Sequence, residues 1–291
     1  GARDTAILGS NVRIRDALRE LLSSALAETG RRPDAVICSG MITSNLGLHE
    51  VPHVRAPAGP DDLARGIVEV AFADVSTAPF AFVPGVKTHP EGLELDDLAG
   101  GDVLRGEEVE VVGMREALGI SSGATFLHFG SHHKAVETDD AGRITSSRTA
   151  ITGELLAAMR EHTILKSSTV PVEEVAIDAQ AVRAGAEATQ RHGLGRAGFL
   201  VRIGEQLGQL DRARMTSYLI GALAALDLPL LEGGSASDPI VLYGHGAFPA
   251  VLEQLLTDGS RPVRRVDGEA ADLAAASGAV ALYQRRKGER T

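Results

Sequence analysis

Short apolar runs alternate with amphipathic segments along this 291-residue chain. The first amphipathic segment predicts a helix over residues 12–28, which Asn11 can cap and Gly30 can end. Its apolar residues recur at helical spacing and are expected to form one face: Val12, Leu18, Leu21, Leu22 and Ala25.

The same two patterns continue to the end of the chain. Further helices are predicted over 60–72, 102–117, 153–163, 176–191, 194–207, 211–226, 246–257 and 269–285. Buried strands are predicted over 35–38, 79–83, 125–129 and 240–243, and an extended meander over 133–138 and 143–150. This alternation of helices and strands is typical of an α/β protein.

The chain is also expected to divide into two parts. The pattern changes near Ser121 and Gly123, and at about 150 residues per domain the length fits two domains. We therefore expect one domain over 1–121 and a second over 122–291.

The composition of the chain argues against several classes of binding partner. The net charge of −10 and the pI of about 5.4 argue against nucleic acid or an anionic membrane as the main partner. Aromatic residues make up only 3% and Trp is absent, so base-stacking surfaces are not expected. Cys38 is the single cysteine, which excludes an intrachain disulfide and fits a reducing, cytoplasmic setting. No apolar run reaches the roughly 18 residues of a membrane span.

Three predicted strands end in glycine, at Gly40, Gly130 and Gly244. In α/β proteins ligands bind beyond the carboxyl ends of the strands, where exposed backbone N–H groups can hold a phosphate. The alternative is that these glycines only permit turns. Three such loops in one chain favour a phosphate or nucleotide site.

A second candidate is the segment 130–134, at the bend between two predicted strands. Small residues let the chain wrap a phosphate there, and Lys134 or Ser131 could bind it. A plain hairpin is the alternative, and a metal cluster is another, on three histidines: His128, His132 and His133. Adjacent residues on a strand point to opposite faces, and no cysteine or carboxylate completes a recognised ligand pattern, so the metal reading is not favoured.

A third candidate lies at Asp102–Glu108. A carboxylate at Asp102 could accept a proton from a substrate hydroxyl, and the Arg105 guanidinium suits a carboxylate or phosphate. The alternative is that Asp102 caps the predicted helix while Arg105 pairs with Glu107 or Glu108 on its surface. Gly106 disfavours a helix by about 1 kcal/mol relative to Ala, so it indicates close packing or ligand approach.

Thr152, Gly153 and Glu154 form a fourth candidate, where the chain enters the helix after the meander. A helix cap at Thr152 would be a sufficient structural explanation. Cys38, His245 and Met159 are expected to be core or lining residues rather than catalytic ones.

Five segments together resemble one family. They are ICSGMITSNLG, DVLRGEEVEVVGM, FLHFGSHHKAV, RTAITGELLAAMREHTIL and IVLYGHGAF, and they span residues from about 35 to 285. The chain resembles the 2-dehydro-3-deoxygalactonokinases, which are sugar-acid kinases of the actin-like ATPase superfamily.

The resemblance implies two ribonuclease-H-like halves with ATP in the cleft between them. Residues 1–121 would bind the sugar acid and residues 122–291 would bind ATP. The reaction would transfer the γ-phosphate of Mg-ATP to the 6-hydroxyl of 2-dehydro-3-deoxy-D-galactonate, in cytoplasmic galactonate catabolism. The partners would be these small molecules rather than nucleic acid or membrane, and the acidic surface would suit a simple homodimer.

The resemblance also implies roles for individual residues. Asp102 and Arg105 would be catalytic. The sugar acid would be bound by Met41, Ser44, Asn45, Arg105 and Glu107. ATP would be bound by Gly130, Ser131, His132, Lys134, Thr152, Gly153, Glu154, Gly244 and Gly246. Glu107 and Glu154 could hold Mg²⁺-bound water, no protein metal ligand is assigned, and the loop 86–101 is expected to move.

The sequence departs from the family pattern at three places. The family opens with a strand and a D-x-G-[ST]-[ST] loop, whereas residues 6–10 lack the aspartate, and we expect that the leading strands of the first half are missing from this chain. The sequence reads Ser131-His132-His133 where Thr-His-Cys is more usual. Thr43 stands where glycine is usual, which could alter the substrate loop.

Other functions compete with this interpretation. A kinase of the same superfamily could act on a hexose or another keto-deoxy acid, although Arg105 favours an acid. A relative that lacks the aspartate could bind nucleotide or sugar without catalysis. A dehydrogenase is disfavoured, because no G-x-G-x-x-G follows a strand and opens a helix with an acidic residue about 20 positions later.

Overall fold

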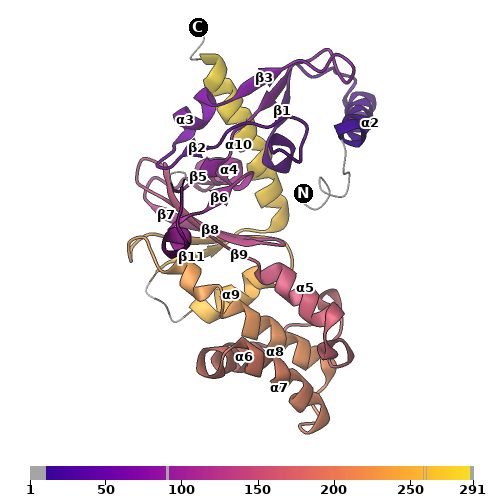
Figure 1. The fold of residues 1–291 in the computed structure, drawn as a ribbon, viewed down its shortest axis with the longest axis vertical. Coiled ribbons are helices and arrows are strands. Elements are labelled where there is room, and N and C mark those ends of the chain that lie inside the picture. The colour runs from indigo at the N-terminus through magenta and orange to yellow at the C-terminus, as the bar shows by residue number, and fades with distance from the viewer. Residues whose placement is uncertain (1–10, 90–91, 258, 260, 289–291) are drawn as a thin grey trace. The chain divides into compact units, whose positions relative to one another are not determined.

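The computed structural model describes residues 11–89, 92–257, 259 and 261–288, which form a mixed α/β structure (Figure 1). The chain separates into two compact units. Unit 1 holds the chain up to Ser122 together with Thr138–Ser147 and everything from Asp272 onward, and unit 2 holds Gly123–Glu137 and Arg148–Ala271. The first passage between units falls beside the expected division. Unit 1 is nevertheless discontinuous, because a hairpin tip and the last helix also belong to it.

Unit 1 contains a three-stranded sheet in the order β1-β4-β3. These strands are β1 (Val36–Cys38), β4 (Phe80–Phe82) and β3 (Val68–Val70). β1 and β4 are the predicted buried strands and pair in parallel, while β3 pairs antiparallel to β4. The phenylalanines of β4 are fully buried, so this strand is the centre of the first core.

The first helix, α2 (Asn11–Thr29), packs on this core through part of the predicted face, at Leu18 and Leu22. Ile14, Leu18 and Leu22 belong to the cluster, at i, i+4 and i+8, whereas Leu21 is 64% exposed and Ala25 is exposed. Gly30 ends α2 at φ +66°, as expected. The side chains of Asn11 and Val12, and the residues 6–10, lie outside the described part.

Two predicted helices of unit 1 are each a strand and a shorter helix. The first expected helix, over 60–72, is α3 (Pro60–Arg65), and β3 follows it, where β-branched valines favour a strand. The second expected helix, over 102–117, is β6 (Val103–Leu104) and α4 (Glu107–Leu118). Gly106 has φ +118°, which a helix cannot contain, so α4 begins after it.

β6 belongs to a second small sheet in unit 1, with the order β2-β5-β6. Its other strands are β2 (Val54–Arg55) and β5 (Val86–Lys87). Between β5 and β6 the chain forms a 3₁₀ helix, η2 (Leu95–Gly100), whose residues are exposed. Movement of the loop 86–101, of which 90–91 lie outside the described residues, stays a prediction.

The last helix, α10 (Gly268–Gly288), crosses α4 at two glycines. A Cβ atom on Gly113 would lie 1.8 Å from the carbonyl oxygen of Ala274, and one on Gly278 would lie 2.1 Å from that of Val109. No side chain fits between these backbones, so the two helices are in direct main-chain contact.

Unit 2 is built on a five-stranded sheet in the order β11-β10-β7-β8-β9. The predicted strands are confirmed as β7 (Ala124–Phe129), β8 (His133–Thr138), β9 (Ile144–Ala150) and β10 (Ile240–Gly244). β10 pairs in parallel with β7 and with β11 (Val263–Arg265). The sequence pattern does not predict β11, because two of its three residues are exposed arginines and it has no apolar run.

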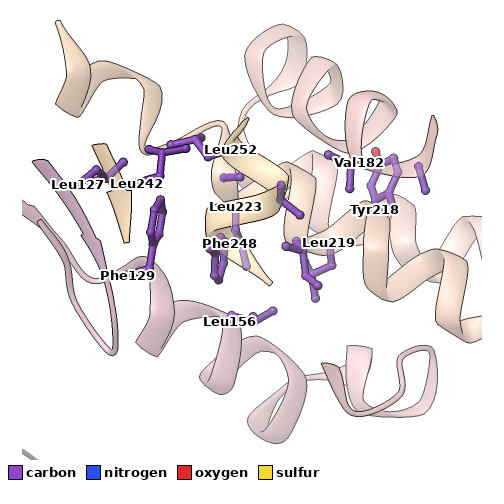
Figure 2. Close-up of a cluster of buried hydrophobic side chains, with 14 of the residues drawn as sticks. Leu127, Phe129, Leu156, Val182, Tyr218, Leu219, Leu223, Leu242, Phe248 and Leu252 are labelled. Carbon is purple, nitrogen blue, oxygen red and sulfur yellow. The ribbon is translucent and has the colours of Figure 1, made fainter. Parts of the chain in front are cut away.

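The predicted helices of unit 2 are also confirmed, with shifts of a few residues at their ends. They are α5 (Thr152–His162), α6 (Ala179–His192), α7 (Leu194–Gln206), α8 (Arg212–Ala224) and α9 (Phe248–Leu256). Phe129 and Leu242 from the sheet meet Leu219, Phe248 and Leu252 from α8 and α9 in one buried cluster (Figure 2). No helix of the described ranges is long and apolar enough to cross a membrane.

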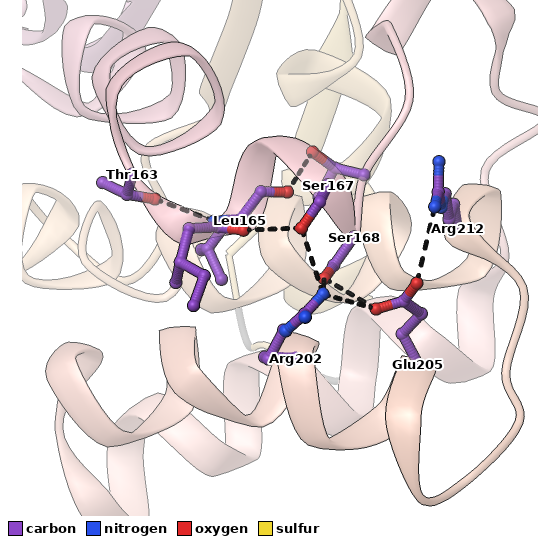
Figure 3. Close-up of polar contacts among 9 residues, drawn as sticks. Thr163, Leu165, Ser167, Ser168, Arg202, Glu205 and Arg212 are labelled. Atoms are coloured by element: carbon purple, nitrogen blue, oxygen red, sulfur yellow. Dashed lines mark hydrogen bonds and ion pairs between the residues drawn. The ribbon is translucent and has the colours of Figure 1, made fainter.

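Short 3₁₀ helices connect these elements: η3 (Ile164–Ser167), η4 (Val172–Glu174) and η5 (Leu228–Leu231). Figure 3 shows how η3 is tied to α7. Arg202 donates to the hydroxyls of Ser167 and Ser168 at 3.0 and 3.1 Å and to Glu205 at 2.9 Å. The helical part of unit 2 is therefore fixed by polar contacts as well as by its core.

Cys38 lies at the end of β1 and is expected to resist thiol reagents. It is buried, and burial raises the pKa of its thiol to about 12. The unfolded thiol ionises near pH 8.5, so alkaline pH above that value favours the unfolded state. We expect Ellman's reagent at pH 8 to label the thiol only in urea, with glutathione as the control for reagent activity. Rapid labelling of the folded chain would contradict this burial.

Candidate functional site

The loop after β1 in unit 1 displays Asn45 at the surface. The chain forms a 3₁₀ helix, η1 (Gly40–Thr43), and the buried Ser44 hydroxyl donates to the carbonyl of Met41 at 2.7 Å and accepts from the N–H of Leu46 at 3.2 Å. Asn45 lies between these contacts and is exposed. Of the three residues expected to bind substrate here, Ser44 shapes the turn, Met41 is half-buried beside it, and Asn45 has the available amide.

Arg105 holds the same loop from the other side. Its Nη1 donates to the carbonyl and hydroxyl oxygens of Thr43, both at 2.6 Å, and its Nη2 bonds Val51 O at 3.0 Å and His53 Nδ1 at 3.2 Å. Arg105 therefore does not pair on a helix surface, and that alternative is wrong. The Arg105 guanidinium was expected to bind substrate, but several of its N–H groups are used in hydrogen bonds to Thr43 and Val51. Burial lowers its pKa, and the charges of nearby glutamates oppose that shift.

Two glutamates close the turn around Gly106. Glu107 accepts the N–H of Arg105 at 3.0 Å, and the fully buried Glu108 accepts the N–H of Gly106 at 2.8 and 2.9 Å. A Cβ atom on Gly106 would lie 3.3 Å from the Cα of Gly40. The close packing expected of Gly106 is thus confirmed, and it joins the end of β1 to the start of α4.

Asp102 lies just before β6 and does not cap α4, which begins five residues later at Glu107. Its Oδ1 accepts the N–H of Val103 at 2.8 Å, and its Oδ2 accepts the hydroxyl of the buried Ser147 at 2.7 Å. These two bonds fix the carboxylate at both oxygens. The sequence pattern does not identify Ser147 as a partner of Asp102, because the two residues are 45 positions apart in the chain.

Replacement of Arg105 by Lys is expected to loosen the loop. An ammonium group cannot span Thr43 on one side and Val51 on the other as the planar guanidinium does. We expect Arg105→Lys to lower the free energy of unfolding by about 1–3 kcal/mol in urea titrations. Arg65→Lys, in an exposed pair with Asp62, is the matched control and should change it by less than about 0.5 kcal/mol. Equal effects of the two variants would contradict the loop-holding role.

The turn between β7 and β8 forms the core of the second cluster, in unit 2. Gly130, Ser131 and His132 are exposed, whereas Lys134 on β8 is buried. The Nε2 atom of His132 lies 3.2 Å from the carboxylate of Glu154, at the start of α5. Two of the segments expected to bind ATP are thereby neighbours.

Gly153 lets the first turn of α5 pack directly on this turn. A Cβ atom there would lie 2.2 Å from the carbonyl oxygen of Gly130, and the N–H of Glu154 donates to the carbonyl of Ser131 at 3.0 Å. The alternative that Thr152 only caps α5 is wrong, because Ile151 holds the cap position and Thr152 is the first helical residue. The buried Thr152 hydroxyl instead donates to Asp227 at 2.6 Å.

Gly244 and Gly246 complete the second cluster. Gly244 is opposite Phe129 in the parallel β10–β7 pair, and a Cβ atom on it would lie 2.3 Å from the Phe129 carbonyl oxygen. Gly246 has φ +85° with no atom within 4 Å of a Cβ position. The glycine ends of two adjacent parallel strands therefore lie side by side, as expected of a phosphate-binding edge.

The three clustered histidines do not converge on a metal site. His133 is fully buried and bonds Asp227 through Nδ1 at 2.6 Å, and the ring centroid of His128 lies 5.1 Å from that of Tyr243, with the two rings tilted by 32°. Within the residues that the structure describes, no group of three His, Cys, Asp or Glu side chains is arranged to hold a metal ion. The sequence pattern does not identify Asp227 as a site residue, because its partner Thr152 is 75 residues away in the chain.

Comparison with known proteins shows the family to which the chain belongs. The profile of a family described as 2-keto-3-deoxy-galactonokinase matches residues 3–281. A Rhizobium meliloti (strain 1021) protein assigned as 2-dehydro-3-deoxygalactonokinase DgoK1 is 26% identical over 251 residues, which cover 84% of this chain and 77% of that protein. The 2-dehydro-3-deoxygalactonokinase of Escherichia coli (strain K12) is 29% identical over 66% of this chain and 60% of its own length.

A solved structure is also similar. The crystal structure of a Sinorhizobium meliloti protein assigned as a 2-dehydro-3-deoxygalactonokinase superimposes with a TM-score of 0.73 at 26% identity. The match covers 90% of this chain and 84% of that one, so both units share their fold with it.

Proposed function

Because the chain belongs to the 2-keto-3-deoxy-galactonokinase family, we propose that it transfers the γ-phosphate of ATP to the 6-hydroxyl of 2-dehydro-3-deoxy-D-galactonate. One observation carries the proposal beyond family membership. The exposed turn 130–132 is joined to the first turn of α5 beside Gly244, which places main-chain groups and a helix N-terminus together at a strand edge.

The proposal also includes the fold of each unit and the substrate that each unit binds. Each unit would be a ribonuclease-H-like half, with the sugar acid held by unit 1 and the nucleotide by unit 2. The similarity of the solved relative over 90% of this chain supports a fold shared with that protein. An ATP-dependent step would operate in the cytoplasm, in agreement with the single buried cysteine.

In unit 1, Asp102 is the proposed base. The oxygen of the 6-hydroxyl bonds to the γ-phosphorus, the bond from that phosphorus to the β–γ bridging oxygen breaks, and the hydroxyl proton moves to Asp102. The bonds from Val103 and Ser147 hold this carboxylate in one orientation. Such positioning accounts for much of the barrier reduction in phosphoryl transfer.

The sugar acid would be held by the loop after β1. Asn45 presents its amide to the substrate, with Met41 and Ser44 forming the turn behind it. Arg105 fixes this loop, and its positive charge attracts the substrate carboxylate. Glu107 completes the set by holding the backbone of Arg105.

In unit 2, the phosphates would meet the turn Gly130–His132, Lys134 and the main chain of Gly153 and Glu154 at the start of α5. The hydroxyl of Thr152, which the sequence placed among the ATP-binding groups, is buried and bonds Asp227 instead. Gly244 and Gly246 would leave room for the adenosine. Mg²⁺ bound to ATP neutralises charge on the phosphate oxygens. The exposed carboxylate of Glu154 beside the turn fits a role in binding its water ligands, because hard oxygen donors suit this ion.

A coupled assay of ADP release tests the proposed function. The 291-residue chain is incubated with Mg-ATP and 2-dehydro-3-deoxy-D-galactonate, and the gluconate-derived epimer serves as the matched control. We expect ADP release that requires the acid and is faster with the galactonate form. Acid-independent release, or nucleotide binding without ADP release, would contradict the proposal.

A further inference from the structure

A carboxylate buried in unit 2 joins the two segments that flank the proposed phosphate site. Asp227 follows α8 and has no exposed surface. Its Oδ2 lies 2.6 Å from Nδ1 of His133, the first residue of β8, and its Oδ1 accepts the hydroxyl of Thr152, the first residue of α5, at 2.6 Å. His133 is also fully buried, and Thr152 is 1% exposed.

The ring of His133 has little freedom to bond elsewhere. It lies edge-on to Phe129 at 4.9 Å and to Phe248 at 4.5 Å, and these two phenylalanines stack within the core shown in Figure 2. Its Nε2 atom is buried and has no hydrogen-bond partner among the described residues. The bond to Asp227 therefore sets the orientation of the ring.

Both partners of Asp227 are adjacent to groups of the proposed site. His133 directly follows the turn 130–132, and Thr152 directly precedes Gly153, which packs on Gly130. The N–H of Glu154 bonds Ser131 across the same junction. A buried carboxylate with two short hydrogen bonds is costly to disturb, because each freed donor or acceptor would be left without water.

We propose that Asp227 is a positioning residue for the nucleotide phosphates, which acts by fixing the start of β8 and the start of α5 so that the turn 130–132 is held in its phosphate-binding form. The inference rests on the proposed function, since it takes the site on this turn to be the ATP site. Asp227 itself is fully buried and would not touch ATP.

Two variants of Thr152 give the sharpest test. Thr152→Val removes the hydroxyl that bonds Asp227 and keeps the shape, whereas Thr152→Ser keeps the hydroxyl. We expect Thr152→Val and Asp227→Ala to raise the KM for ATP roughly tenfold or more, equivalent to 1.4 kcal/mol, while the KM for the sugar acid stays within about twofold. Thr152→Ser should keep the KM for ATP within about threefold of the parent value.

The matched control is Thr189→Val, which removes another buried hydroxyl of unit 2, bonded to the carbonyl of Ala222 at 2.8 Å. This variant should lower the urea midpoint without changing the KM for ATP. If Thr152→Val lowers stability in the same way and leaves the KM for ATP unchanged, Asp227 is only a structural residue and the inference is overturned. An equal rise in both KM values has the same consequence.

Binding of a fluorescent ADP analogue separates this inference from the proposed function. A parent chain that binds the analogue but does not phosphorylate the acid would refute the proposed function, and weaker binding by Thr152→Val would still support the positioning role. A parent chain that binds no analogue would overturn both. Asp227→Ala could fail to fold, and the Thr152 pair then decides.

Discussion

Replacement of Asp102 by Asn is expected to lower kcat by about 10²- to 10⁴-fold, the range that general base catalysis contributes. The amide cannot take the proton of the 6-hydroxyl, yet it has the same shape as the carboxylate. The Ser147 hydroxyl can rotate and accept from the new NH₂ group, so the contact that is 2.7 Å long in the parent chain survives. The measurement is coupled ADP release at saturating ATP and sugar acid.

Nucleotide binding is the control for this prediction. Asp102 is in unit 1 and the proposed nucleotide residues are in unit 2, so the affinity for a fluorescent ADP analogue should match that of the parent chain. Ser147→Ala should lower kcat less than Asp102→Asn, because it removes the orientation of the base but not the base itself. A kcat for Asp102→Asn within a few-fold of the parent would exclude Asp102 as the base.

The second large effect is expected from Gly153→Ala. The new Cβ atom would lie 2.2 Å from the carbonyl oxygen of Gly130 and 2.8 Å from that of Ser131, so the turn must move away from α5. Overpacking of this kind costs about 1–3 kcal/mol. Since the same turn is the proposed phosphate contact, we expect the KM for ATP to rise about tenfold or more, with the ADP analogue bound correspondingly less tightly.

Gly195→Ala in α7 is the matched control, because a Cβ atom there has no neighbour within 4 Å. A glycine inside a helix is less favourable than alanine by about 0.5–1 kcal/mol, so this variant should raise the urea midpoint and leave the KM for ATP unchanged. If Gly153→Ala also bound ATP as the parent does, the turn 130–132 would not be the nucleotide site.

Local patterning predicts the fold well where burial is simple. The strands at 80–82 and 240–244 are largely buried and the strand at 36–38 is partly buried, and all three end near glycines. It fails where a short strand adjoins a helix, as at Val68–Val70 and Val103–Leu104. Pairing with another strand decides these segments, and two or three residues with a strand preference are too few to outweigh the helical pattern beside them.

The candidate site divides in the same way. Glycines mark the strand edge because the backbone itself must approach closely, and Gly244 and Gly153 both have contacts that no side chain would allow. The residues that orient the site carry no such local signature. Ser147 and Asp227 are 45 and 75 residues from the partners they hold, so only the folded chain brings them together.

The contact between α4 and α10 has a consequence for the order of synthesis. The face of α4 around Gly113 is covered by the main chain of α10, which follows unit 2 in the sequence. Chains emerge at roughly 5–20 residues per second, and all of unit 2 up to Ala271 is translated before that covering segment. Unit 1 therefore cannot complete its packing until unit 2 has been translated.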